Sequence, residues 1–142
     1  MRSRFWVLPV AAGFLAVALA GAARAQEKPE DAAAAGAEAW LKVVDQGTYG
    51  QSWEDAAGLF KKAVAKEQWA AAAKAAREPL GKLLSRKPKS REYTKTLPGA
   101  PEGEYVIIQY DSSFENKKEA VETIVPMKDA DGAWRVSGYF IK

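Results

Sequence analysis

The sequence has neither histidine nor cysteine among its 142 residues. These absences exclude disulfide bonds, thiolate nucleophiles, serine–histidine–aspartate triads and zinc sites built from histidine or cysteine. Acid–base catalysis would depend on a carboxylate, a lysine or a tyrosine, and each of these needs a large pKa shift to act near neutral pH. The sequence also lacks a glycine-rich phosphate loop, and we predict no metal ion, no cofactor and no catalytic residue.

The first 25 residues have the layout of a secretory signal peptide. Arg2 and Arg4 precede an uncharged run at 5–23, and residues 23–25 form the small-x-small pattern that signal peptidase cleaves. We predict cleavage before Gln26, which places the protein in the periplasm or outside the cell. The alternative is a retained membrane anchor, but the run ends in a processing site instead of a stop-transfer cluster.

The positive net charge belongs to that first segment. The chain has 21 Lys and Arg against 18 Asp and Glu, and three of the arginines, Arg2, Arg4 and Arg24, precede the predicted cleavage site. The rest of the chain is therefore neutral. Its charge does not favour a nucleic-acid partner.

Three amphipathic runs in the first half of the chain each predict a helix with one tryptophan and several alanines on one face. Alanine lets helices approach closely, and the indole fills the remaining gap. We expect Gly47 to end the first helix and Ser52 to cap the second. The three stripes are Ala33, Ala37, Trp40, Leu41 and Val44; Trp53, Ala56, Ala57, Phe60 and Val64; and Trp69, Ala72, Ala73, Ala76 and Leu80.

In the second half of the chain the hydrophobic pattern alternates, which predicts β-strands. The expected strands cover residues 93–97, 104–112, 120–127 and 133–141. Turns at 116–117 and 131–132 join the last three of them. These turns place Tyr110 opposite Thr123 and Thr123 opposite Phe140, so both turns assign the same residues to the same face.

The expected register divides the strands into two faces. One face is predicted to pack on the helices and comprises Val106, Ile108, Tyr110, Val121, Thr123, Val125, Met127, Val136 and Phe140. The opposite, outer face combines the apolar residues Tyr105, Ile107, Ile124, Tyr139 and Ile141 with Gln109, Glu122, Arg135 and Ser137. So much apolar surface predicts an interaction face that is covered by a partner, or by the leader or first helix of the same chain.

Helices followed by strands indicate an α+β domain. We predict about three N-terminal helices packed on one face of a four-stranded antiparallel meander. Cystatin-like and nuclear-transport-factor-two-like cones share this general plan. Residues 26–31 are expected to form a flexible leader, and residues 32–142 a single domain whose length and tryptophan content suffice for one core.

Polar residues predicted on the core face suggest a ligand pocket. Tyr110 and Thr123 are expected to be cross-strand neighbours, and Trp134 would help to line an apolar cavity with them. The alternative is that the two polar side chains bond to each other or to the backbone at the edge of the core.

Two groups of charged residues have simple structural interpretations. Asp111, Glu122 and Arg135 are expected on the outer face, where exposed ion pairs are common and weak. The basic stretch from Lys82 to Lys95 would suit a polyanion or acidic lipid head groups. However, Pro88 favours a solvated connection between the last helix and the first strand.

Several short motifs follow one another in a fixed order from residue 40 to residue 139. They are Trp40-Leu41, Asp45-x-Gly47-x-Tyr49-x-x-Ser52-Trp53, Arg77-x-Pro79-Leu80-Gly81, Leu97-Pro98-Gly99-Ala100-Pro101-x-Gly103-x-Tyr105, Phe114, Glu122-Thr123, Pro126-Met127 and Asp131-Gly132-x-Trp134-Arg135-Val136-x-Gly138-Tyr139. In order and spacing the chain resembles an uncharacterised family of exported bacterial proteins, the domain of unknown function 4019. The resemblance implies an exported single domain. It implies no activity, cofactor or catalytic residue, because that family has none assigned.

We expect an exported, non-enzymatic binding or assembly module of the bacterial envelope, because the usual catalytic residue types are absent and the outer face is apolar. The expected partner on that face is a second copy of the chain or another exported protein. Nucleic acid is not expected, and a membrane contact is expected only through an uncleaved signal segment. The alternative is a small-molecule binder, or an isomerase- or hydrolase-like enzyme, with a pocket between helices and sheet.

Overall fold

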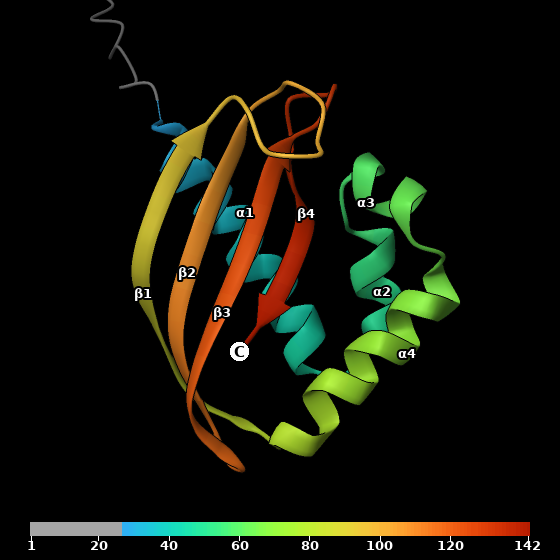
Figure 1. The fold of residues 1–142 in the computed structure, drawn as a ribbon, viewed down its shortest axis with the longest axis vertical. Helices are drawn as coiled ribbons and strands as arrows, with labels where there is room; N and C mark the ends of the chain where they lie inside the picture. Colours follow the sequence, from blue (N-terminus) through green and yellow to red (C-terminus); the bar gives the residue numbers. More distant parts are fainter. Residues whose placement is uncertain (1–26) are drawn as a thin grey trace, which may run out of the picture.

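A computed structural model describes residues 27–142 as helices followed by a four-stranded sheet (Figure 1). The predicted signal segment and its cleavage site before Gln26 lie outside the described residues. The helices are α1 (Pro29–Asp45), α2 (Tyr49–Glu54), α3 (Gly58–Ala63) and α4 (Lys66–Arg77), followed by a 3₁₀ turn, η1 (Glu78–Leu80). The strands are β1 (Leu83–Thr94), β2 (Tyr105–Phe114), β3 (Lys117–Lys128) and β4 (Trp134–Ile141).

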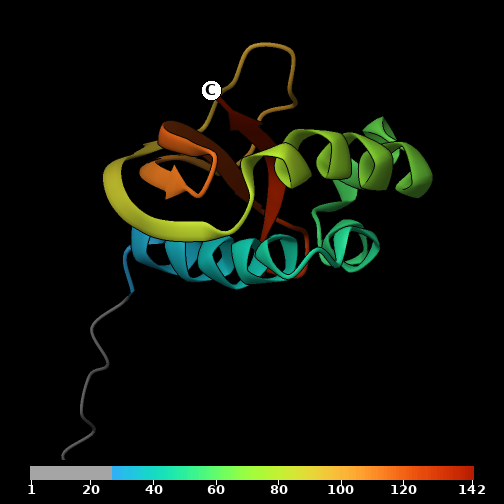
Figure 2. The same cartoon turned by 90° about the horizontal axis from the view of Figure 1, so that it is seen from below.

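The strands form one antiparallel sheet in the order β1-β2-β3-β4. Helix α1 runs along one face of the sheet, and α2, α3 and α4 gather beside its β4 edge (Figure 1; Figure 2). The predicted α+β class and antiparallel meander are therefore confirmed, with four helices in place of about three. We call the α1 side of the sheet the inner face and the opposite side the outer face.

Helix α1 follows its predicted stripe. The five stripe residues Ala33, Ala37, Trp40, Leu41 and Val44 are all buried. The helix begins at Pro29, where the fixed φ of proline suits the first turn, so residues 29–31 are helical and do not belong to a flexible leader. It ends at Asp45, and Gly47 follows with a φ of 78° that glycine adopts without strain.

The second predicted helix is divided into α2 and α3. Between them the Ala57 N–H donates to the Val136 carbonyl of β4 at 2.8 Å. Ser52 does not cap a helix, because it is buried inside α2 and its hydroxyl accepts a hydrogen bond from the Trp69 indole at 2.8 Å. A contact with the edge of the sheet thus interrupts the helix, and no local pattern in the sequence reveals that contact.

Aromatic rings fill the space between the helices and the sheet. The ring centroid of Trp40 lies 5.9 Å from that of Trp69 and 5.5 Å from that of Tyr139. Phe60 meets Trp69 edge-on at 4.9 Å. The Trp40 indole also donates to the Ser52 carbonyl at 2.8 Å, which satisfies its polar atom inside the core. Trp40 and Trp69 therefore pack against other aromatic rings in the core, while Trp40 and Trp134 also line a groove of about 760 Å³ between α1, α3 and the start of β4.

The basic stretch from Lys82 to Lys95 is mostly strand β1 and not a solvated connection. The sequence does not reveal this strand, because its cations and proline obscure the pairing with β2, which extends along the whole strand. Three of its cations are already paired: Arg86 with Asp45 and Glu122, Lys89 with Asp111 at 3.7 Å, and Arg91 with Asp31 at 3.1 Å. Much of the charge that suggested a polyanion site is thereby neutralised within the domain.

The register between β2 and β3 differs from the predicted one by a single residue. Tyr110 lies opposite Glu122 instead of Thr123. The hairpin turns at residues 115–116 in place of 116–117. Strand β3 has apolar residues on both faces, so its hydrophobic pattern does not distinguish the observed register from the predicted one.

The register between β3 and β4 is partly as expected. Thr123 lies opposite Phe140, as predicted. Nearer to the turn, Met127 pairs with Arg135 instead of Val136, because a bulge at Ser137 in β4 shifts the pairing by one residue.

The one-residue difference exchanges the two faces of β3 and much of β4. The residues predicted for the core that lie on the outer face are Val121, Thr123, Val125, Met127 and Phe140. The residues predicted to point outward that lie on the inner face are Glu122, Ile124, Tyr139 and Ile141. The core positions of Val106, Ile108, Tyr110 and Val136 are confirmed, since all four are buried.

Candidate functional site

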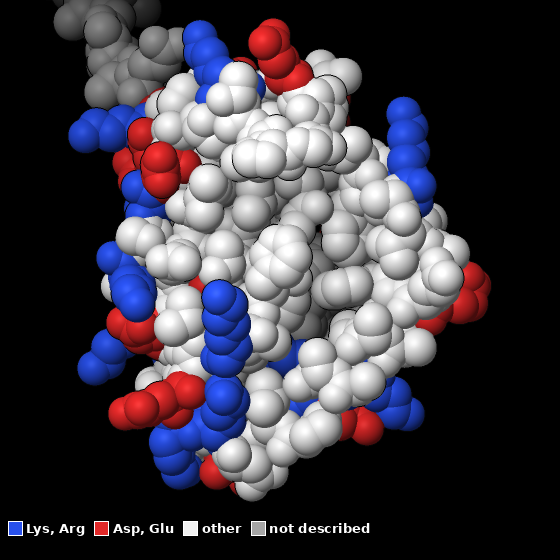
Figure 3. Space-filling view, viewed as in Figure 1, with Lys and Arg blue, Asp and Glu red and all other residues white. Residues whose placement is uncertain are grey.

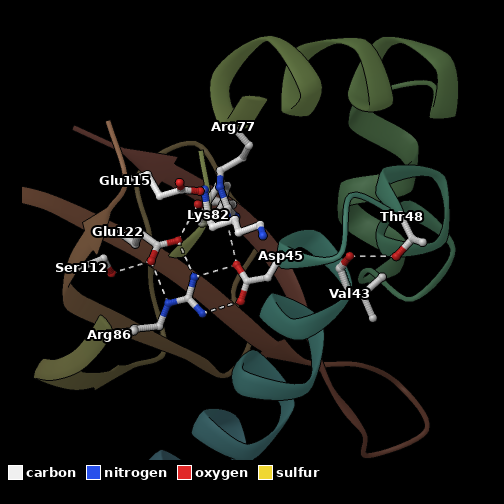
Figure 4. Close-up of polar contacts among 10 residues, drawn as sticks. Val43, Asp45, Thr48, Arg77, Lys82, Arg86, Ser112, Glu115 and Glu122 are labelled. Carbon is white, nitrogen blue, oxygen red and sulfur yellow. Dashed lines mark hydrogen bonds and ion pairs between the residues drawn. The ribbon is translucent and has the colours of Figure 1, made fainter. Parts of the chain in front are cut away.

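Six elements each contribute one polar side chain to a network between the helices and the sheet (Figure 4). Its members are Asp45 of α1, Arg77 of α4, Arg86 of β1, Ser112 of β2, Glu122 of β3 and Tyr139 of β4. Two carboxylates and two guanidinium groups balance in charge. We call this cluster the ion network.

Arg86 lies at the centre of the ion network. Its Nε and Nη2 donate to the two oxygens of Glu122 at 2.7 and 3.1 Å. Its Nη1 and Nη2 donate to the two oxygens of Asp45 at 2.8 and 3.0 Å. The side chain of Arg86 is 13% exposed and that of Glu122 is 0% exposed. Arg86 therefore connects β1 to β3 and to α1 through bidentate pairs that water hardly screens.

The Glu122 carboxylate has its full set of hydrogen bonds. The Ser112 and Tyr139 hydroxyls donate to its two oxygens, each at 2.5 Å. With the two bonds from Arg86, each oxygen accepts two hydrogen bonds. A carboxylate has about four lone-pair positions, so Glu122 has none left to take a proton from a substrate unless it loses a partner.

Arg77 connects the end of α4 to the end of α1. Its side chain is 5% exposed, and its Nη2 donates to Asp45 at 2.7 Å. The guanidinium carbon lies 4.9 Å from the centre of the Phe114 ring, a favourable cation–π contact. Its Nε and Nη1 have no hydrogen-bond partner among residues 27–142. Asp45 and Phe114 are thus the groups that compensate for burying this cation.

The ion network keeps Asp45 ionised and Tyr139 protonated at neutral pH. Burial raises the pKa of Asp45, but the hydrogen bonds and charges of Arg86 and Arg77 outweigh burial and hold the pKa below its ordinary value. Burial and the neighbouring Glu122 carboxylate raise the pKa of Tyr139 well above that of a free phenol. Tyr139 therefore remains a hydrogen-bond donor.

The depressed pKa of Asp45 predicts a loss of stability in acid. Because the folded pKa lies below the unfolded value of about 3.9, the carboxylate stabilises the fold fully above that pH and loses this effect as the pH falls through the folded value. We expect Asp45→Asn to be less stable than the wild type at neutral pH, with a gap that narrows below about pH 4. Urea unfolding across this pH range measures the gap, and a constant gap would contradict the role given to Asp45.

Two tyrosines on the inner face, Tyr139 and Tyr110, provide a matched test of the network. Tyr139→Phe should lower the free energy of unfolding by about 1.5–3 kcal/mol, because it removes a hydrogen bond to a charged carboxylate. Tyr110→Phe should leave it unchanged or raise it, because the buried Tyr110 hydroxyl has no partner in the described part of the chain. Equal losses for the two variants in urea unfolding would show that the Tyr139 hydrogen bond adds nothing.

The three residues predicted to line a ligand pocket do not come together. Tyr110 is 2% exposed on the inner face, whereas Thr123 lies on the outer face. Trp134 lies opposite Lys128 at the start of β4 and packs against the core. The predicted pairing of Tyr110 with Thr123 is wrong, because a shift of one residue moves a side chain to the other side of a sheet.

The five apolar residues predicted for the interaction face are also separated. Ile124, Tyr139 and Ile141 lie on the inner face, and Ile124 is fully buried. Tyr105 and Ile107 are on the outer face. Tyr105 is nevertheless fully buried there, because the loop between β1 and β2 packs against its ring at Gly103 and accepts its hydroxyl hydrogen bond at 2.6 Å.

Of the three charged residues predicted as exposed ion pairs, two have that role. Arg135 pairs with Asp131 at 2.8 Å, and Asp111 pairs with Lys89 at 3.7 Å. Glu122 does not, because it is fully buried in the ion network. The error has the same origin as the others, since Glu122 belongs to the strand whose register was displaced.

The outer face is uncharged across its middle and charged towards its margins (Figure 3). One row across the strands is Ser90, Gln109, Thr123 and Phe140, and the next is Glu92, Ile107, Val125 and Gly138. Phe140 is 62% exposed, and its ring rests on Gly138, where a Cβ would lie 3.3 Å from the ring. The loop between β1 and β2 crosses this face near one end (Figure 1).

The ion network was not identified from the sequence. The sequence predicts that Arg86 lies in a solvated connection between a helix and a strand, so it does not place Arg86 on either face of the sheet. Asp45 carried the one usable signal, because it follows Leu41 by four residues and so continues the apolar side of α1. A carboxylate in that position indicates a buried cation partner, although it does not say which one.

Comparison with known proteins provides a family but no activity. A family model described as "Protein of unknown function (DUF4019)" matches residues 36–139, a range that contains the whole ion network. No curated protein and no solved structure matches the chain. Residues 27–142 contain no cluster of three or more Asp, Glu, His or Cys that could hold a metal ion. Within the same residues no helix is long and apolar enough to span a membrane.

Proposed function

The chain belongs to the DUF4019 family, whose members are proteins of unknown function. We propose that it is an exported, non-enzymatic binding module of the bacterial envelope. Its binding surface is the outer face of the sheet. The observation that carries the proposal is the 62% exposure of Phe140 beside the uncharged middle of that face (Figure 3). Apolar surface left uncovered on a folded domain is typical of a binding site.

The state of the ion network supports a binding role over a catalytic one. A general base needs a free lone pair and a pKa near the working pH. Glu122 has no unoccupied lone-pair position, and the pKa of Asp45 is lowered instead of raised. The side chains of the ion network instead hold α1, α4 and the strands of the sheet together.

Packed side chains fill two parts of the space between the helices and the sheet, so neither part suits the alternative of an internal ligand pocket. Stacked rings of Trp40, Trp69 and Tyr139 occupy the part near β4. The ion network occupies the part near the ends of α1 and α4. A ligand there would have to displace packed side chains.

Export rests on residues 1–25, which have the order of a signal peptide. Intact-mass measurement on the protein recovered from the exported fraction of its own host tests this part of the proposal. The expected result is the mass of a chain that begins at Gln26. A chain that keeps its first 25 residues, or that stays in the cytoplasm, would contradict it.

The binding surface is tested by photo-crosslinking in the host. A photoreactive amino acid replaces Phe140 in one variant and Lys62, an exposed residue of α3, in the control. We expect an adduct from position 140 and none of the same mass from position 62. No adduct at 140, or the same adduct from both positions, would refute the outer face as the binding surface.

A further inference from the structure

A groove rich in lysine lies on the outer face at the end where β2 turns into β3, and its volume is about 490 Å³. Its charged lining residues are Lys87, Asp111, Lys117, Lys118, Glu119 and Lys142. We call it the lysine groove. A row of paired residues at this level crosses β1, β2 and β3 and ends on the residue after β4; it comprises Lys87, Asp111, Val121 and Lys142. The groove therefore belongs to the sheet and not to a single loop.

The lysine groove carries excess positive charge. Its four lysines form no ion pair within residues 27–142. Asp111 is compensated by Lys89, which lies outside the lining. Glu119 is the remaining acidic side chain of the lining, so four lysines face one uncompensated carboxylate. The groove favours an anionic ligand.

Two exposed apolar side chains flank the lysine groove. Phe140 is 62% and Leu84 is 55% exposed. Phe140 precedes Lys142 by two residues in the same extended segment, so both point to the same side. Leu84 immediately precedes Ser85, which lines the groove. Figure 3 shows Lys and Arg side chains on the lower part of this face next to uncharged surface.

We propose that the lysine groove docks the protein on an anionic membrane surface, an inference that rests on the proposed function and names its partner. The lysines contact the phosphate groups of the lipid heads, and Phe140 and Leu84 enter the boundary between head groups and acyl chains. A dissolved phosphate would use the lysines and gain nothing from the two apolar side chains. The combination of unpaired cations with exposed apolar groups is what favours the bilayer.

The ion network supports this surface from behind. Ser112 lines the lysine groove, and its hydroxyl donates to the buried Glu122. Arg86, the partner of Glu122, is adjacent to Lys87 in β1. The strands that present the lysines are thus held in place by the same contacts that join the sheet to the helices.

Vesicle co-sedimentation at low salt tests the proposal. The protein comprises residues 26–142, which contain the complete core, since its members run from Ala33 to Val136. The vesicles contain either phosphatidylglycerol with phosphatidylcholine or phosphatidylcholine alone. Lys87→Glu with Lys118→Glu should weaken binding to anionic vesicles at least tenfold, because each reversal replaces an attraction to the anionic surface by a repulsion.

The matched control is Lys42→Glu with Lys62→Glu, which makes the same change in net charge on the exposed sides of α1 and α3. It should bind as the wild type does. Phe140→Ser should weaken binding while leaving its dependence on salt unchanged, because no charge is removed. Circular dichroism checks that each variant is folded, and Lys→Gln changes at Lys87 and Lys118 provide a milder second pair.

Three results would overturn the proposal. The control could lose as much binding as the groove variant, or the wild type could bind neutral vesicles equally well. The wild type could also ignore anionic vesicles while polyphosphate protects the groove lysines from acetylation, which would assign the site to a dissolved anion. Failure of the proposed function looks different, because the photoreactive Phe140 variant would then form no adduct at all. A protein adduct without vesicle binding would refute the membrane alone.

Discussion

Replacing Arg86 with alanine is expected to lower the free energy of unfolding by about 3–5 kcal/mol. The substitution leaves the fully buried Glu122 without its cation and removes the bidentate partner of Asp45. Among the described residues the Arg77 side chain donates a hydrogen bond to Asp45 and none to Glu122, so it does not replace Arg86. Urea unfolding at neutral pH measures this loss. The midpoint urea concentration should fall, while the dependence of the unfolding free energy on urea concentration should stay unchanged.

Arg91→Ala is the matched control for this prediction. Arg91 is an arginine of the same strand and also forms an ion pair, with Asp31 at 3.1 Å. Its side chain is 32% exposed and that of Asp31 is 56% exposed, so water competes for both groups. We expect a loss below about 1 kcal/mol. Similar losses for Arg86→Ala and Arg91→Ala would show that burial gives the ion network no particular weight.

Truncating Ile124 to alanine is expected to cost about 2–5 kcal/mol, because this side chain is fully buried on the inner face. Thr123→Ala, one position earlier on the outer face, should change the free energy of unfolding by no more than about 0.5 kcal/mol. The adjacent pair is a direct test of register, since any slip by one residue exchanges the two environments. Urea unfolding of both variants under identical conditions provides the comparison.

The opposite order of effects would contradict the observed pairing of β2 with β3. A large loss for Thr123→Ala with a small one for Ile124→Ala would restore the register predicted from the sequence. It would also return Glu122 to the outer face and remove the basis of the ion network. The predictions for Arg86 and for the Ile124 and Thr123 pair therefore both depend on the register of β3 against β2. If both are confirmed, the stability measurements support this register twice.

The helical half of the protein was predictable where one surface decided the outcome. Helix α1 has a single apolar stripe that packs on a single sheet, and all five predicted stripe residues are buried. The prediction of one continuous second helix is wrong, because the backbone between α2 and α3 hydrogen-bonds to the carbonyl of Val136 in β4. Ser52 likewise resembles a cap in sequence but serves as a buried acceptor for the Trp69 indole.

The sheet was predictable in topology and not in register. Alternation within β2 assigned Val106, Ile108 and Tyr110 to the core correctly. Strand β3 has no such alternation, so its position depended on the exact turn residues, and the hairpin turns one residue earlier than expected. That small difference moved Glu122 from a solvent-facing surface to the centre of the domain.

The sequence by itself determined the α+β class, the absence of thiol and imidazole chemistry, the stripe of α1 and the family to which the chain belongs. These properties depend on composition, on periodicity within one element and on the order of motifs, which are all local. Only the tertiary structure decided which charges are buried together and which apolar residues remain exposed. Asp45, Arg86 and Glu122 are distant in sequence and meet because the register of β3 and the packing of α1 bring them within hydrogen-bonding distance. A hydrogen bond requires its partners to lie within about 3 Å, so a shift of one residue along a strand creates or abolishes the network.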